Sequence, residues 1–228
     1  MSHVMLDEIR IDVVRKKMKN IRLTIYPSTG KIRLSVPKKT SEKMIQSFLK
    51  SKLDWIKKHS QISENQIRIN YNFETGENHA FLGKLYPLEV IYQEKRQKVE
   101  LKNEILYLLV NKDSTKENRQ RLFNTWYRKQ LEAILPEMIA HWENIMQVKV
   151  EEWRIKSMKT KWGTCNITKK RIWLNLELIK KTKEQLEYVV VHEMVHLFEK
   201  YHNKRFYDLM THYLPNWKEI RKQLNQIV

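Results

Sequence analysis

Residues 188–198, YVVVHEMVHLF, carry two imidazoles and a carboxylate inside an otherwise apolar run. The run lies in a segment with a helical pattern, which we expect to extend from Lys183 to about Lys200. A helix that is apolar on nearly every side is buried in a core. Because ionisable groups are costly to bury without partners, the fold has to supply a common partner for His192, Glu193 and His196.

His192 and His196 are four residues apart, which puts them on the same face of a helix, one turn above the other. Two imidazoles at this spacing can bind one metal ion at roughly 2.0–2.1 Å each, and zinc prefers such ligands. Glu193 completes the H-E-x-x-H pattern and lies where it can take a proton from a bound water. The alternative is a pair of hydrogen-bonded core histidines beside a surface glutamate.

A zinc site of this type needs a third protein ligand and keeps its fourth position open for water. His202, six residues after His196, is the candidate. A continuous helix would carry it away from the first two histidines, so we expect a break around Lys200–Tyr201, with Asn203 capping the next helix. Metzincins share this histidine spacing, but Glu199 stands where they have a glycine.

The composition is that of a globular protein. Of the 228 residues 41% are hydrophobic, and no run of 18 apolar residues is present, so a membrane span is not expected. The first residues lack the apolar core of a signal peptide, and we expect a cytoplasmic protein. The single cysteine, Cys165, excludes a disulfide framework and a cysteine-rich zinc site.

The net charge of +18, from 44 Lys and Arg against 26 Asp and Glu, is the strongest bias in the composition. Such an excess attracts polyanions, so a nucleic acid or a nucleotide is a possible partner of the basic surface. The basic residues are spread from end to end, which favours the simpler interpretation that they cover solvated faces. The sequence does not predict the oligomeric state.

The hydrophobic pattern predicts an α+β fold in two parts. Residues 1–113 form a β-rich N-terminal region of short strands, with a turn at 28–30 and one helical segment that begins near Ser41. From residue 114 the pattern changes to a long helix over 116–146, which Pro136 is expected to bend or split. The remaining elements of the part 114–228 are strands within 150–158 and 161–176, then helices at 183–200, 203–213 and 215–228.

Several stretches together resemble one known family, the YgjP-like metal-dependent hydrolases, which are related to the SprT-like and WLM zinc metallopeptidases. The most specific are KTKWGTCN, IWLNLELI and YVVVHEMVHL, followed by HNKRF, in this order. The resemblance implies a zincin-like metallopeptidase core with an active-site helix and a small sheet. It also implies that His192, His196 and His202 bind the metal and that Glu193 is the general base. Tyr207 departs from the family pattern, which has Trp there.

These observations favour a zinc-dependent hydrolase, in the first place a metallopeptidase that acts on a peptide or protein. Glu193 would take a proton from a zinc-bound water, which attacks a carbonyl, and then return it to the leaving amine. One alternative is a metal-dependent nucleotide phosphohydrolase, although phosphate chemistry usually recruits Mg²⁺ through carboxylates. The other is a nucleic-acid-associated protease, as among the SprT-like relatives.

The sequence also suggests residues that could support the metal site, although no motif identifies them. Gly163 is expected on a strand along the cleft, where it allows a close backbone approach. Cys165 is expected to be a small buried residue. Five tryptophans are expected in the core, namely Trp126, Trp142, Trp153, Trp162 and Trp173. The candidates for stabilising an oxyanion are Lys161, Tyr201 and Tyr207. The carboxylates that could orient the ligand imidazoles are those of Glu187, Glu199 and Asp208.

Overall fold

The structure is a computed structural model that describes residues 2–7, 9–26, 31–57, 71–94 and 96–224. It is a mixed α+β fold with two compact units, Met1–Asn70 and Tyr71–Val228. The boundary differs from the expected one at 113/114. The reason is packing, because Phe73, Leu88 and Leu106 lie in the same buried cluster as Phe123 of the long helix.

The first unit is a four-stranded sheet with a helix. Its elements are β1 (Ser2–Leu6), β2 (Ile9–Lys16), β3 (Arg22–Ile25), β4 (Ile32–Pro37) and α1 (Glu42–Ser51). The strand order is β1-β2-β4-β3, and only the β2/β4 pair is parallel. Ser41 caps α1 by accepting a hydrogen bond from the Met44 amide, as predicted. Strand β1 is an addition to the predicted elements, and the expected turn at 28–30 lies outside the described residues.

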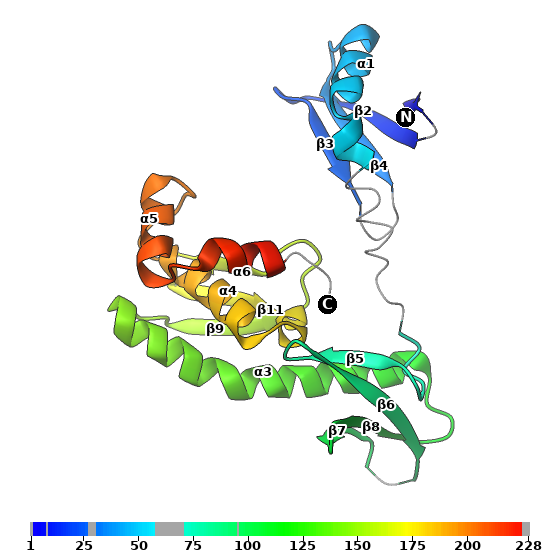
Figure 1. The fold of residues 1–228 in the computed structure, drawn as a ribbon, viewed down its shortest axis with the longest axis vertical. Helices are drawn as coiled ribbons and strands as arrows, with labels where there is room; N and C mark the ends of the chain where they lie inside the picture. The colour runs from blue at the N-terminus through cyan, green and yellow to red at the C-terminus, as the bar shows by residue number, and fades with distance from the viewer. Residues whose placement is uncertain (1, 8, 27–30, 58–70, 95, 225–228) are drawn as a thin grey trace. The chain divides into compact units, whose positions relative to one another are not determined.

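The second unit begins with a sheet and a long helix (Figure 1). The sheet has the order β5-β6-β8-β7 and consists of β5 (Asn78–Phe81), β6 (Lys84–Tyr92), β7 (Lys98–Lys102) and β8 (Ile105–Val110). Helix α3 (Lys116–Met146) follows and is continuous through the exposed Pro136. Pro136 therefore does not split the helix, contrary to one of the two expected effects.

The rest of the second unit surrounds one buried helix. Its elements are β9 (Glu152–Lys156), β10 (Gly163–Asn166), β11 (Arg171–Asn175), the 3-10 helix η1 (Leu176–Lys180), α4 (Lys183–Val195), α5 (Lys204–Tyr213) and α6 (Trp217–Leu224). The three strands have the order β10-β11-β9, so β10 is an edge strand. Helix α4 contacts β10, β11, α3, α5 and α6.

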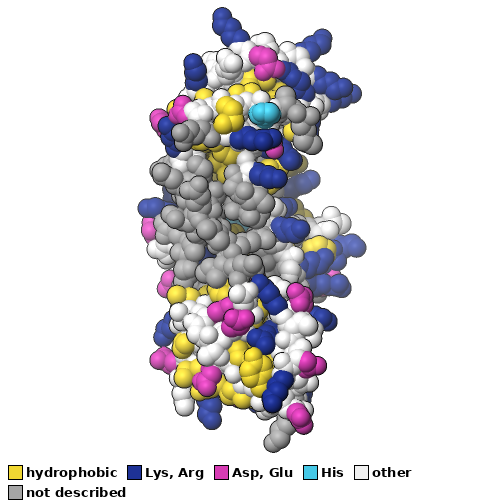
Figure 2. All heavy atoms as spheres, turned by 90° about the vertical axis from the view of Figure 1, so that its right-hand side faces the viewer, with side chains coloured by type: hydrophobic (Ala, Val, Ile, Leu, Met, Phe, Trp, Pro, Cys, Tyr) yellow, Lys and Arg dark blue, Asp and Glu magenta, His cyan; other side chains and the backbone are white. Residues whose placement is uncertain are grey.

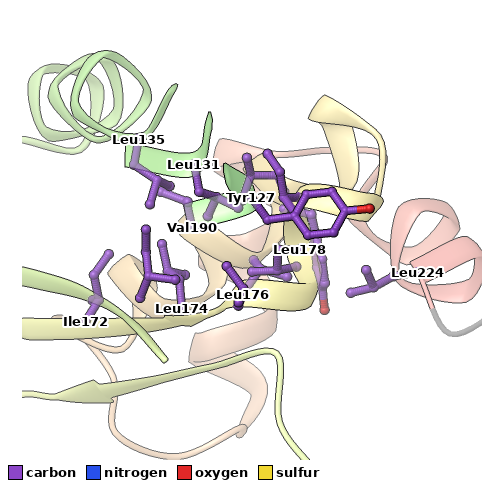
Figure 3. Packing of buried hydrophobic residues seen from close by; sticks show 14 of the residues in the cluster. Tyr127, Leu131, Leu135, Ile172, Leu174, Leu176, Leu178, Val190 and Leu224 are labelled. Carbon is purple, nitrogen blue, oxygen red and sulfur yellow. The ribbon is translucent and has the colours of Figure 1, made fainter. Parts of the chain in front are cut away.

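The core around α4 is built from both sides (Figure 3). Leu131 and Leu135 of α3 point toward Val190 of α4, and Ile172 and Leu174 of β11 approach from the opposite side. All five side chains are buried. Burial of such side chains is worth about 1.5–3 kcal/mol each, so the helix that carries the histidines is held rigidly.

The two units differ in surface charge. More than half of the net charge of +18 belongs to residues 1–70. Figure 2 shows Lys and Arg side chains projecting from the first unit, whereas acidic and basic side chains alternate over the second unit on this face. Among the described residues, no helix has both the length and the apolar character needed to cross a membrane.

Candidate active site

Helix α4 starts and stops at defined positions. Thr182 and Gln185 form a reciprocal capping box, in which each side chain binds the other residue's backbone amide at 3.2 Å. The helix ends at Val195, earlier than the expected end near Lys200. The reason is a tightening of the last turn, where the amides of Leu197 and Phe198 bind carbonyls three residues back, at 2.9 and 3.0 Å.

The three predicted ligands come together after this early stop. Nitrogen atoms of His192, His196 and His202 all lie within 4.8 Å of one another, and the Nε2 atoms of His192 and His202 are 3.0 Å apart. Two nitrogens that bind one tetrahedral zinc ion are roughly 3.3 Å apart. All three rings contact the buried ring of Phe206, with centroids 4.6 to 4.9 Å away. The three imidazoles therefore fit a single metal ion.

The segment after α4 orients two of these rings. The Nδ1 atom of His196 lies 3.0 Å from the backbone carbonyl of Glu199, so Nε2 is the nitrogen that faces the other histidines. Asn203 caps α5, as predicted, because its side chain accepts a hydrogen bond from the Phe206 amide at 3.0 Å. This cap holds the backbone next to His202 in place.

The predicted orienting carboxylates have other partners. Glu187 accepts a hydrogen bond from the Trp142 indole at 3.0 Å, and Asp208 pairs with Lys204 at 2.7 Å. Glu199 contributes its carbonyl to His196, while its carboxylate accepts the Tyr201 amide at 3.2 Å. A backbone carbonyl thus takes the role that had been expected of a side chain, and sequence patterns do not reveal carbonyl positions.

Glu193 is the only acidic group among the described residues that line the cleft, and only 5% of it is exposed. A Cβ atom at Gly163 would lie 2.6 Å from its Oε1 atom and 2.7 Å from its Cγ atom. Gly163 therefore leaves room for this side chain, and the close approach of a substrate backbone to this edge strand stays a prediction. Burial raises the pKa of Glu193 to about 8, and the charge of Lys161 opposes the rise.

The electrostatics of the histidines suit metal binding. Burial lowers the pKa of His192 to about 3, and the charges of His196, His202 and Arg221 add to this effect. Burial, followed by the charges of His196 and Arg221, also lowers the pKa of His202. Both rings are therefore neutral at pH 7, which is the form that binds a metal ion.

A cleft of about 1150 Å³ opens over these residues. It is lined by residues 160–168 around β10, by Arg171 and Trp173 of β11, by residues of α4 and of the segment that follows it up to His202, and by Arg221 and Leu224 of α6. Lys161 is the only one of the three oxyanion candidates that lines it, because Tyr201 is 66% exposed elsewhere and Tyr207 stacks on Trp217. No sequence motif identified Arg221 as a cleft residue, because it reaches the cleft only through the packing of α6.

Two further predictions concern the cleft walls. Cys165 is half-buried, and burial together with the charge of Glu193 raises the pKa of its thiol to about 12. It is therefore unreactive at neutral pH. Trp126 and Trp142 are buried as predicted, whereas Trp162 and Trp173 are half-buried and line the cleft.

Comparisons with known proteins identify the family. The model of the YgjP-like family, described as a metallopeptidase domain, matches residues 19–227. The chain therefore belongs to the YgjP-like family, as its motifs predicted, and carries a metallopeptidase domain. No curated protein matches it.

Two solved structures are similar to part of the chain. The zymogen of the metallopeptidase abylysin from Pyrococcus abyssi is 21% identical, with a TM-score of 0.38, over 40% of this chain and 91% of its own. The metallopeptidase zymogen jannalysin from Methanocaldococcus jannaschii is also 21% identical, with a TM-score of 0.35, over 39% of this chain and 91% of its own.

Proposed function

We propose that this protein is a zinc-dependent peptidase, in which His192, His196 and His202 bind the metal and Glu193 is the general base. The observation that carries the proposal is the convergence of three imidazole nitrogens within 4.8 Å beside one buried carboxylate. The proposal assigns a zincin-like core to the second unit, with α4 as the active-site helix and β9–β11 as its small sheet.

The donor set favours zinc over other divalent ions. Three imidazoles with an open fourth position are ligands of catalytic zinc, whereas Mg²⁺ and Ca²⁺ take oxygen ligands. Glu193 is the single carboxylate among the described cleft residues. When bound, zinc would polarise a carbonyl and make a water molecule more acidic.

The chain's own residues would supply the remaining chemistry. Glu193 occupies the space that Gly163 leaves. Burial favours its protonated form, and the charge of a bound metal ion would favour the carboxylate, which can take a proton from water and return it to the leaving amine. The carbonyl of Glu199 fixes the orientation of the His196 ring. Lys161 lies in the cleft wall, where its positive charge would stabilise negative charge that develops on the substrate. The buried rings and aliphatic side chains around α4 exclude water from the other side of the site.

Metal analysis and one matched pair of variants test the proposal. The wild type is expected to hold about one zinc ion per chain, and His196→Ala is expected to lose it. Glu193→Gln is expected to keep the zinc and to lose hydrolysis of a peptide library. Full zinc content in His196→Ala would disprove the metal site, and an active Glu193→Gln variant would remove Glu193 from the role of general base.

A second candidate is hydrolysis of a nucleotide phosphate. The observation in its favour is the set of Lys and Arg side chains in the cleft wall, which suits a phosphate group. Nucleotides should therefore be tested beside peptides, with Glu193→Gln as the control. Nucleic-acid binding by the basic surface stays a prediction, which steep salt dependence of DNA binding would support.

A further inference from the structure

The sheet of the first unit has one covered face and one open face. Side chains point alternately to the two faces along each strand. On the covered face, Val13 and Leu34 are buried in one cluster with Ile45 and Leu49 of α1. Helix α1 is the single helix among the described residues of the first unit. The opposite face of the sheet is therefore not covered by any helix within the described part of this unit.

The open face carries an excess of positive charge. Among the residues of β2, β3 and β4 that alternate with the buried ones, four are cationic and one is acidic. They are Arg10, Lys16, Arg22 and Arg33, against Asp12. Arg10 lies 3.9 Å from Asp12, a long ion pair between partly exposed groups, which is worth little. The open face thus follows the bias of residues 1–70, which have 16 Lys and Arg against 6 Asp and Glu.

Most of these cations are arginines. The whole chain has 31 lysines and 13 arginines, yet three of the four cations on the open face are arginines. A guanidinium group can bind a phosphate through two parallel hydrogen bonds, whereas an ammonium group acts as a point charge. Arg33 donates a hydrogen bond from Nη1 to the Tyr26 hydroxyl at 3.1 Å and lies 5.1 Å from the centroid of that ring. Because the phenol is uncharged, this contact orients Arg33 without neutralising it.

We propose that the open face of the first unit binds the sugar-phosphate backbone of a single-stranded nucleic acid. A duplex is read by an element that fits into a groove, such as a helix or a two-stranded ribbon. A face of four strands is broader, and it suits a single strand that lies across it, as in the RNA-binding domains that use a four-stranded sheet. The inference is independent of the proposed peptidase function, because it concerns the other unit and other residues.

The uncharged residues of the open face also suit this partner. The hydroxyls of Thr24 and Ser35 lie on the same face as the arginines, since Thr24 pairs with Arg33 and Ser35 pairs with Arg22. Hydroxyl groups donate hydrogen bonds to phosphate oxygens. Binding to an anionic membrane would instead need large apolar side chains beside the cations. On β2 and β4 the uncharged residues of this face are small, namely Val14, Ser35 and Pro37.

Contacts with phosphates have a characteristic dependence on salt. Each phosphate of a single strand that a protein neutralises makes the slope of log K against the logarithm of the salt concentration steeper by about 0.7. Loss of two such contacts should therefore reduce the slope by about 1.4, which corresponds to about 25-fold in affinity at about 0.1 M salt. This change in slope identifies the side chains that contact phosphates.

The first experiment measures binding of a fluorescent single-stranded DNA to the full-length protein over a range of salt concentrations. The strand has about 20 nucleotides, which exceeds the roughly 4–16 nucleotides that one small binding domain covers. The wild type is compared with Lys16→Gln/Arg22→Gln, which is expected to lose about 1.4 in slope and about 25-fold in affinity at about 0.1 M salt. The matched control is Lys43→Gln/Lys50→Gln, which removes two charges at exposed positions of α1, on the other side of the sheet. The control is expected to keep the wild-type slope.

Several results would overturn the inference. One is the absence of binding by the wild type, and another is an equal loss of slope in the two variants. A third is displacement of the labelled strand by a DNA duplex, or by vesicles that contain anionic lipid, at a lower phosphate concentration than by the unlabelled strand. None of these results bears on zinc content or on peptide hydrolysis, so the peptidase function is tested separately.

A second measurement tests the same face without any substitution. The wild type is treated with an acetylating reagent in the presence and absence of excess unlabelled single strand, and the modified lysines are identified by mass spectrometry. Lys16 is expected to lose reactivity when the strand is bound, whereas Lys43 and Lys50 of α1 are expected to react as before. Unchanged reactivity of Lys16, or equal protection of all three lysines, would contradict binding at the open face.

Discussion

Replacement of Gly163 by Ala is the perturbation that most directly tests the position of Glu193. The new Cβ atom would lie 2.6 Å from Oε1, which is about 0.8 Å closer than the 3.4 Å at which ordinary contacts begin. It would also lie 2.7 Å from Cγ and 2.9 Å from Cδ. Because the clash involves the whole carboxyl end, rotation of the terminal group alone cannot relieve it, and the side chain has to move.

The expected effect is a loss of hydrolysis with the metal retained. A displacement near 1 Å of a group that acts on the reacting atoms costs about 100-fold in rate, which corresponds to ~2.7 kcal/mol. Gly163→Ala is therefore expected to lower kcat by about two orders of magnitude, while the zinc content stays at about one per chain. The measurements are peptide hydrolysis under saturating substrate and metal analysis of the purified variant.

A double-mutant cycle supplies the control. The overpacking is expected to lower the free energy of unfolding by about 1–3 kcal/mol in Gly163→Ala. In a Glu193→Ala background the clashing atoms are gone, so the same substitution is expected to cost almost nothing. Full activity in Gly163→Ala, or an unchanged cost of Gly163→Ala in the Glu193→Ala background, would refute the argument that this glycine makes room for the Glu193 carboxylate.

Three other predictions concern the elements around the site. Asn203→Ala removes the cap of α5, so it is expected to lower the free energy of unfolding by about 1 kcal/mol and to weaken zinc binding through His202. Asn203→Asp preserves the cap and should keep both the stability and the zinc affinity near those of the wild type. An unaltered zinc affinity in Asn203→Ala would contradict this role of the cap. Thr182→Ala is expected to lower the stability of α4 by about 1 kcal/mol, measured by urea unfolding, whereas Thr182→Ser should be near wild type. Burial, opposed by the hydrogen bond to Glu77, lowers the pKa of His79 to about 4. His79 should therefore contribute a loss of up to about 3 kcal/mol of stability between pH 6.5 and 4 in the metal-free protein, in addition to the losses from His192 and His202, because the unfolded chain takes up a proton that the folded chain does not. His79→Phe should show a correspondingly smaller loss, and identical pH profiles would exclude His79 as a cause.

Much of the candidate site was predictable from local patterns. A spacing of four residues puts His192 and His196 on one face of any helix, and an apolar sequence around them predicts burial. Asn203 is a strong capping residue, so a helix start after His202 was also readable from the sequence. The structure confirms the cap and brings the three histidines together.

The domain boundary was not predictable, because it depends on which buried surfaces meet. The pattern change near residue 114 is a change from strands to a helix. The packing, however, joins β5–β8 to α3 through residues such as Phe81, Leu108 and Phe123 in one buried cluster. Hydrophobic periodicity shows that a side chain is buried but does not show what covers it.

Thus the sequence by itself determined most of the elements, the family and the identity of the candidate ligands, since these depend on residue types and on spacings within a few helical turns. Only the tertiary structure decided what surrounds them: the room that Gly163 leaves for Glu193, the Glu199 carbonyl on His196, and the approach of Arg221. The physical reason is that each of these contacts joins backbone or side-chain atoms whose relative positions follow from the packing of separate elements or from the shape of a turn. No local pattern of residues encodes such positions.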